Sequence, residues 1–192
     1  MLRKLAIAVV AIAVLVVVVG LLLPRRWHVE QSVVINATPA RIHPFISNLR
    51  SWQEWASWSK ELDPQVRNSY EGPADGTGAK WSWLGPKMGH GRMEIAMADP
   101  RVGVEINEAI ESESINAHSS FVYRSEGAGT RVTWVDEGTL PVMLGGYFRS
   151  SVERQLGTYF QQGLDSLKQR VEALPPEAAP DPGRVRPDAG LP

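Results

Sequence analysis

The segment that decides the fold is YFRSSVERQLGTYFQQGLDSLKQRV, residues 147–171. Large apolar residues recur there every three or four positions and form one stripe: Phe148, Val152, Leu156, Phe160, Leu164, Leu167 and Val171. This spacing predicts a long amphipathic helix that buries one face. Gly157 and Gly163 interrupt the helix, at a cost of about 1 kcal/mol each against alanine where exposed. Either they let the helix approach a sheet, or they leave room for something between the two.

The residues before this helix read mostly as strands separated by turns. A first strand is expected over 29–37, then a helix that Thr38 caps, Pro39 begins and Pro44 kinks or interrupts. A second short helix is expected within 49–59. Six more strands follow, at 66–71, 79–84, 90–98, 102–110, 115–124 and 130–140. Short turns between them predict one seven-stranded antiparallel sheet, an α+β fold whose apolar face only the 147–171 helix is large enough to cover.

The N-terminal run LAIAVVAIAVLVVVVGLLL, residues 5–23, carries no charge. As a helix it would span about 28 Å, close to the hydrocarbon core of a bilayer. We interpret residues 1–26 as an uncleaved, single-pass anchor in a bacterial-type inner membrane, because no small-x-small cleavage site precedes Arg25; a cleaved signal peptide is the alternative. The α-amino group, Arg3 and Lys4 against Arg25 and Arg26 slightly favour an exported domain.

Composition limits the remaining function classes. Residues 175–192 are rich in proline and are expected to be a disordered tail, which leaves one domain over residues 27–174. That domain has 14 basic and 18 acidic residues, a formal net charge of −4, so a nucleic-acid partner is not expected. The chain has no cysteine, which excludes disulfides, thiolate nucleophiles and Cys-ligated metals. Oligomeric state is not specified by the sequence.

Several local motifs occur in a characteristic order. They are Thr38-Pro39, Pro44-Phe-Ile-Ser47, Trp52-x-x-Trp-x-x-Trp58, Asp63-Pro64, Tyr70-x-Gly-Pro73, Gly76-x-Gly-Ala79, Trp81-x-Trp83, Gly89-x-Gly-x-Met-x-Ile95, Gly129-Thr-Arg-Val-Thr-Trp134 and Gly163-Leu-x-x-Leu-Lys168. Over about residues 29–174 the chain thereby resembles the SRPBCC superfamily, with its START-like helix-grip fold and its polyketide cyclase/dehydrase-type members. The resemblance implies a curved sheet that grips the C-terminal helix, with a cavity for an apolar ligand between them.

Strand alternation predicts the residues that face this cavity. The candidate ligand-binding residues are Trp81, Trp83, Met93, Ile95, Met97, Val104, Ile106, Phe121, Tyr123 and Trp134 from the strands, with Phe148, Leu156 and Phe160 from the helix; Val102 and Val132 share the same face. Solid core packing is the equal alternative. For Trp52, Trp55 and Trp58, packing at the end of the sheet is favoured over a place at the cavity mouth.

Few polar residues on the predicted inner face are suited to chemistry. Tyr123 and Asp136 are weak catalytic candidates, as a proton donor and as a base of raised pKa, and Ser119 accompanies them. The four histidines are far apart in sequence without metal-ligand spacing, so neither a metal nor another cofactor is predicted.

Three functions remain open. The favoured one is membrane-anchored binding of a lipid or other hydrophobic small molecule. The second is a polyketide cyclase/dehydratase-like enzyme, against which the missing catalytic motif weighs. The third is a protein-interaction module of the cell envelope.

Overall fold

The computed structural model describes residues 1–111 and 114–175. The elements, in chain order, are α1 (Leu2–Leu22), β1 (Arg26–Ile35), α2 (Pro39–Ser47), α3 (Trp52–Trp55), β2 (Arg67–Glu71), β3 (Lys80–Gly85), β4 (Gly89–Asp99), β5 (Gly103–Ile110), β6 (Ile115–Glu126), β7 (Gly129–Thr139) and α4 (Gly145–Glu172). The predicted tail lies outside the described residues, apart from Pro175.

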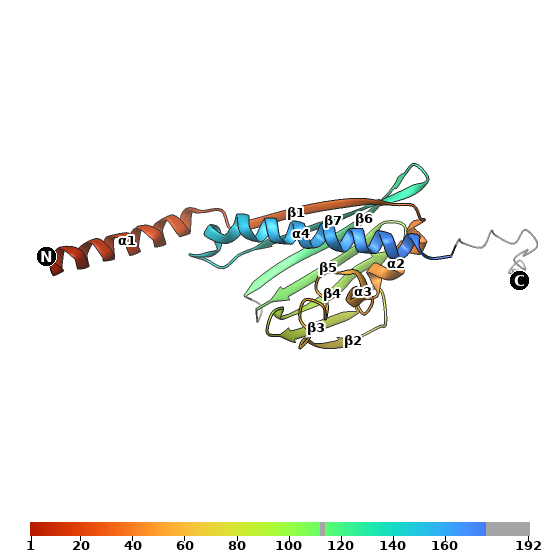
Figure 1. Cartoon of the computed structure of the whole chain (residues 1–192), viewed down its shortest axis with the longest axis horizontal. Coiled ribbons are helices and arrows are strands. Elements are labelled where there is room, and N and C mark those ends of the chain that lie inside the picture. The colour runs from red at the N-terminus through yellow and green to blue at the C-terminus, as the bar shows by residue number, and fades with distance from the viewer. Residues whose placement is uncertain (112–113, 176–192) are drawn as a thin grey trace, which may run out of the picture.

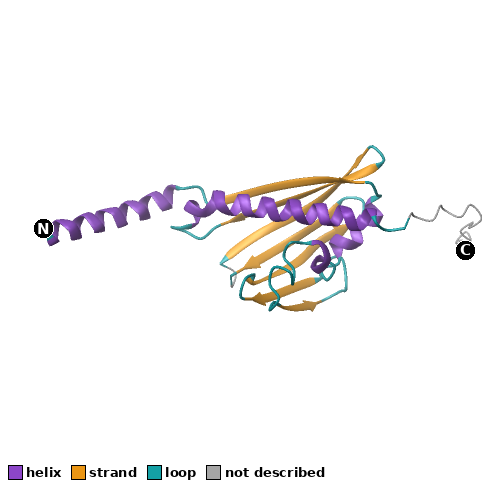
Figure 2. Ribbon diagram, viewed as in Figure 1, coloured by secondary structure: helices purple, strands orange, loops and turns teal. Residues whose placement is uncertain are grey.

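The seven strands form one antiparallel sheet in the order β1-β7-β6-β5-β4-β3-β2. Strands β2 to β7 are a meander, and β1 pairs with the last strand, β7, along its whole length. Figures 1 and 2 show α4 running along one face of this sheet, beside β1 and β7. The predicted α+β architecture is therefore confirmed.

The stripe on α4 is buried over the C-terminal half of the helix but not at its start. Phe160, Leu164 and Leu167 are buried, whereas Phe148 is 58% exposed. The prediction that Phe148 faces the sheet is wrong, because the first turn of α4 lies beside α1 instead: the Tyr147 hydroxyl donates to the carbonyl of Val16.

Two strand predictions also need correction. A β-bulge between Ile95 and Met97 shifts the register of β4 against β5. Ile95 still pairs with buried Ile106, but Met97 pairs with exposed Glu105 and leaves the inner face. The extra residue in β4 reverses which of the following side chains point inward. Val102 precedes β5 and is 54% exposed.

The short helices close one end of the sheet, as predicted. Thr38 occupies the N-cap of α2 in extended conformation and Pro39 follows at the first helical position, but α2 continues through Pro44 to Ser47. In α3, Trp52 donates its indole N–H to the Ile46 carbonyl and Trp55 donates to the Phe45 carbonyl. These bonds fasten α3 to α2.

α1 is the one helix, among the residues that the structure describes, that is long and apolar enough to cross a membrane. Its side chains are exposed along nearly the whole length, and only Gly20 is buried. Figure 1 shows α1 leaving the domain at the end where α4 begins, roughly in line with it.

Candidate functional site

A cavity of about 140 Å³ lies between the inner face of the sheet and α4. Every strand except β2 contributes to its wall, together with α3, α4 and two connecting segments. The lining residues are Trp27, Trp52, Trp58, Trp81, Trp83, Met88, Met93, Glu108, Ile110, Ala117, Trp134, Asp136, Leu156 and Phe160. Six of these are tryptophans, so the wall is mainly aromatic.

Ring packing holds this aromatic wall in place. Trp134 stacks on Phe160 of α4 with 4.0 Å between ring centroids and 13° between planes. Trp81 and Trp83 lie 5.1 Å apart on β3, and their indole N–H groups donate to Asn68 and to the Met88 carbonyl. Because these N–H groups have partners elsewhere, the two rings present apolar surface to the cavity.

The three tryptophans of the WxxWxxW motif serve both packing and cavity. Trp52 and Trp55 are buried and lie in edge-to-face contact with Phe121 and Trp134. Trp58 is half-buried against Phe160. Trp52 and Trp58 reach the cavity, whereas Trp55 does not.

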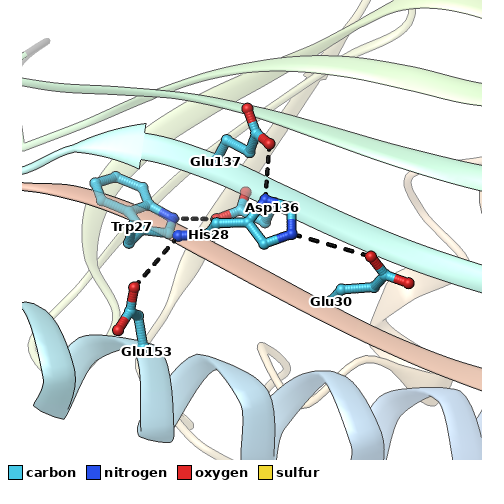
Figure 3. Close-up of polar contacts among 6 residues, drawn as sticks. All are labelled: Trp27, His28, Glu30, Asp136, Glu137 and Glu153. Atoms are coloured by element: carbon cyan, nitrogen blue, oxygen red, sulfur yellow. Dashed lines mark hydrogen bonds and ion pairs between the residues drawn. The ribbon is translucent and has the colours of Figure 1, made fainter.

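Two carboxylates interrupt the apolar wall. Asp136, on β7, is buried and accepts hydrogen bonds from Trp27 Nε1 at 2.5 Å and Ser119 Oγ at 2.7 Å. Figure 3 shows the Trp27 indole directed at Asp136. Glu108, on β5, is half-buried and also lines the cavity. Its cross-strand neighbours Met93 and Ala117 line it too.

The cavity environment raises the pKa of both carboxyls. For Glu108, removal from water is the main cause and the negative charge of Asp136 adds to it, which brings its pKa to about 8. Burial also raises the pKa of Asp136, but the bonds from Trp27 and Ser119 oppose this rise. Those bonds favour the ionised form of Asp136. Near neutral pH the negative charge of the pair therefore lies on Asp136 and the proton on Glu108.

The structure brings together about half of the predicted ligand-binding residues. Those that line the cavity are Trp81, Trp83, Met93, Trp134, Leu156 and Phe160, together with the catalytic candidate Asp136. Ile95, Val104, Ile106 and Phe121 are buried in the core and do not line it. Phe148 and Met97 lie away from it, as described above.

Tyr123 does not face the cavity either. Its hydroxyl lies 3.3 Å from Nδ1 of His43 on α2, and the two rings meet edge to face. Burial raises the pKa of this phenol, so it is a poor proton donor at neutral pH. Among the catalytic candidates from the sequence, only Asp136 lies at the cavity.

Glu108 is the main residue that the sequence reasoning missed. The alternation that places Val104 and Ile106 on the inner face of β5 places Glu108 there as well, so the signal was present. Ile110 and Ala117 lie on the same alternation and were missed as well, whereas Trp27 and Met88 fall outside the predicted strands. Asp63 fixes the turn that carries Met88 by accepting the backbone N–H groups of Lys87 and Met88.

The histidines lie outside the cavity wall. Figure 3 shows His28 at the surface of β1 with Glu30, Glu137 and Glu153, and its Nδ1 is 2.7 Å from Glu137. Within residues 1–111 and 114–175, no group of histidine and carboxylate side chains is arranged to hold a metal ion.

Comparison with solved structures finds the same fold in several bacterial proteins. Protein CV1439 from Chromobacterium violaceum superimposes with a TM-score of 0.56 at 14% identity, over 78% of this chain and 99% of that one. TTHA0849 from Thermus thermophilus gives a TM-score of 0.56 at 18% identity, over 75% and 96% of the two chains. The Aha1 dimer from Colwellia psychrerythraea gives 0.55 at 16% identity, over 76% and 96%.

Sequence comparison assigns the family. No curated protein matches the chain in sequence. The profile of the family described as polyketide cyclase / dehydrase and lipid transport matches residues 26–172, which run from the start of β1 to the end of α4. The chain therefore belongs to the polyketide cyclase/dehydrase and lipid transport family.

Proposed function

We propose that this protein is a membrane-anchored binding protein for a hydrophobic small molecule that carries one polar group. The observation that supports this most directly is the cavity between sheet and α4, with its wall of aromatic rings and its two carboxyls. Sites for small molecules are typically concave and apolar, with a few polar groups that orient the ligand. The family description, which includes lipid transport, agrees with this use.

The size of the cavity limits what it holds. At about 140 Å³ it is close to cavities that bind a single benzene ring and smaller than the roughly 300–1,000 Å³ of drug-sized sites. We therefore propose that it takes one ring, or one end of a longer molecule whose remainder leaves past the half-buried side chains of Met88 and Leu156.

The polarity of the cavity limits the ligand further. A protonated Glu108 donates a hydrogen bond, and an ionised Asp136 already has two donors. A carbonyl or hydroxyl oxygen on an otherwise apolar ligand would accept the proton of Glu108 without leaving a polar group unpaired.

We place the domain of residues 27–174 at a membrane through the anchor of residues 1–26. The length and hydropathy of α1 support the anchor, although a signal sequence has the same properties. By charge distribution we propose a bacterial-type inner membrane with the domain on the exported side. Such a tether holds the cavity where apolar ligands concentrate.

Extraction of the purified protein tests this function. The full chain, purified in detergent, is extracted with organic solvent and the extract is analysed by mass spectrometry. We expect a co-purifying apolar compound in the wild type and its loss from Leu156→Trp, which fills the cavity. Arg154→Trp, on the exposed side of α4, is the matched control and should retain the compound. A wild-type protein that yields no compound and binds nothing from a lipid panel would contradict the proposal.

A cyclase/dehydratase-like activity is the second candidate, and the raised pKa of Glu108 beside Asp136 favours it. A protonated carboxyl could protonate the hydroxyl that leaves as water in a dehydration, and Asp136 could take the proton from carbon. Glu108→Gln separates the two functions: it should abolish conversion of a poly-β-ketone to an aromatic product if the protein is an enzyme. Retention of the extracted ligand with no conversion by either protein would support binding alone.

A further inference from the structure

Exposed apolar residues cluster where β7 joins α4. Val142, Met143, Leu144, Tyr147 and Phe148 are between 41% and 59% exposed, and we call them the β7–α4 patch. Outside residues 1–22, the other large apolar residues that are exposed in the described chain are Leu84, Val102 and Leu174, which are scattered. A continuous group of this kind usually marks a surface that meets a protein or a membrane.

α1 packs directly against this patch. The Tyr147 hydroxyl donates to the Val16 carbonyl at 2.7 Å. A side chain at Gly20 of α1 would collide with the Met143 carbonyl, and one at Gly146 of α4 would collide with Leu23. Because Gly20 and Gly146 have no side chains, α1 and the start of α4 can approach closely.

This contact fixes the depth of the patch relative to α1. Val16 lies six residues before the end of α1 at Leu22, which corresponds to about 9 Å along the helix axis. If α1 crosses a bilayer, Tyr147 stands at the level of its final turns, inside the boundary that Arg25 and Arg26 mark after the helix. An amphipathic tyrosine is typical of that level.

The same end of the domain carries part of the cavity wall. Trp27 lies four residues after Leu23, and Leu156 lies nine residues after Tyr147 on α4, about 14 Å along its axis. Figure 1 shows the β7–α4 connection at the end of the domain from which α1 leaves.

We propose that the β7–α4 patch inserts into the lipid bilayer beside α1, so that the domain is seated on the membrane with its cavity end toward the acyl chains. This rests on the proposed anchoring by α1. The bilayer is the occupant that the structure favours, because the patch is continuous with a helix whose own exposed surface is apolar. Insertion would let an apolar ligand move between membrane and cavity without crossing water.

Site-directed fluorescence tests the proposal, and the absence of cysteine in the chain allows single labels. Each of five full-length variants, Val9→Cys, Leu84→Cys, Val102→Cys, Leu144→Cys and Phe148→Cys, carries an environment-sensitive dye. The proteins are reconstituted into phosphatidylcholine/phosphatidylglycerol vesicles, with or without lipids spin-labelled on the acyl chain. All five native side chains are exposed, so folding should survive labelling.

We expect the labels at residues 144 and 148 to shift their emission to the blue and to lose most of it to the spin-labelled lipids. Labels at residues 84 and 102 should do neither. Quenching at residue 9 without quenching at 144 and 148 would overturn the insertion of the patch while leaving the anchor intact. A blue shift at 144 and 148 without lipid quenching would also overturn it, because a protein would then cover the patch. No quenching at residue 9 would refute the anchor itself, and with it the assignment of depth.

Discussion

Glu108 and Asp136 are the acidic side chains in a cavity that is otherwise mainly aromatic. Burying a charge is costly unless hydrogen bonds or opposite charges compensate. Asp136 has that compensation from Trp27 and Ser119, so the proton remains on Glu108. The two residues therefore differ in role although both are carboxyls, one as an ionised acceptor and the other as a neutral donor.

Glu108→Gln should stabilise the fold at high pH. The pKa of Glu108 is raised to about 8 in the folded chain and is near 4.3 when unfolded, so the folded state holds more protons between these values and wild-type stability falls as pH rises through that window. Glutamine mimics the neutral carboxyl and avoids this loss. We expect equal stability at pH 4 and a gain of about 1–2 kcal/mol at pH 9, since partial exposure of Glu108 reduces the full effect.

Denaturant unfolding of the full chain in detergent at several pH values measures this difference. Glu105→Gln, at an exposed position of the same strand, is the matched control and should show no such trend. A Glu108→Gln variant whose advantage does not grow with pH would contradict the assignment of the proton to Glu108.

Trp27→Phe should weaken the fold through Asp136. It removes one of the two hydrogen bonds that Asp136 accepts, and a bond to a charged group contributes about 1.5–3 kcal/mol. The cost should appear in the free energy of unfolding at pH 7. It should shrink at acid pH, where Asp136 is protonated and the bond is weaker. A cost that is independent of pH would show that only the packing of the ring matters.

At the level of strands and helices, glycines decide where tryptophan rings can lie. Gly138 pairs with Trp27 and Gly91 pairs with Trp83 across neighbouring strands. A side chain at either glycine would collide with the paired ring. Both rings line the cavity, so these two glycines shape its wall. Gly157 on α4, by contrast, has room for a side chain, because the nearest atom to an added Cβ there is Nε2 of Gln31 at 3.4 Å.

Gly138→Ala should destabilise the domain by about 1–3 kcal/mol, the usual cost of overpacking. The added methyl group displaces Trp27 and lengthens its bond to Asp136. Thermal unfolding of the full chain measures the loss. An unchanged midpoint would mean that Trp27 can occupy another position at little cost.

Gly157→Ala should act in the opposite direction. The space beside Gly157 accommodates a methyl group at ordinary contact distance, and alanine favours a helix over glycine by up to about 1 kcal/mol. We expect a rise in unfolding midpoint under the same conditions. A fall would indicate that α4 must approach β1 more closely here than the structure has it.

At the scale of the whole molecule, α1 and the domain form one elongated body with the junction at Gly20 and Gly146. The positive charges at the start of α1, from the α-amino group, Arg3 and Lys4, exceed by one those that follow it, Arg25 and Arg26. Orientation in the membrane follows the side with more positive charge, which stays in the cytoplasm. On this charge difference rests our proposal that the domain and its cavity lie outside the cytoplasm.

Protease treatment of spheroplasts tests that orientation. With an epitope tag after Pro192, we expect external protease to remove the tag from intact spheroplasts, while a soluble cytoplasmic marker stays intact. A variant with Arg3→Gln, Lys4→Gln and lysines added after Arg26 has the opposite charge difference. It should keep the domain in the cytoplasm and so protect the tag from external protease. A tag on the wild-type chain that is digested only after lysis would show the reverse orientation.

The sequence by itself determined the elements with strong periodicity. The apolar stripe on α4, the short turns between β2 and β7 and the charge-free run of α1 each depend on local spacing, and the structure has all three. The motif order also led to the correct fold family. Strand alternation identified Trp81, Trp83, Met93, Trp134 and Asp136 as inner-face residues, and the helical stripe identified Leu156 and Phe160.

Tertiary structure decided the rest, because a cavity is what remains after side chains from distant strands have packed. The bulge at Ile95 and Met97 changes which residues face inward, and it has no local signature in the sequence. Phe148 belongs to the helical stripe, yet it is 58% exposed, at the end of α4 from which α1 leaves the domain. Burial raises the pKa of Glu108, and the negative charge of Asp136, two strands away, raises it further. Both causes exist only once the sheet has formed.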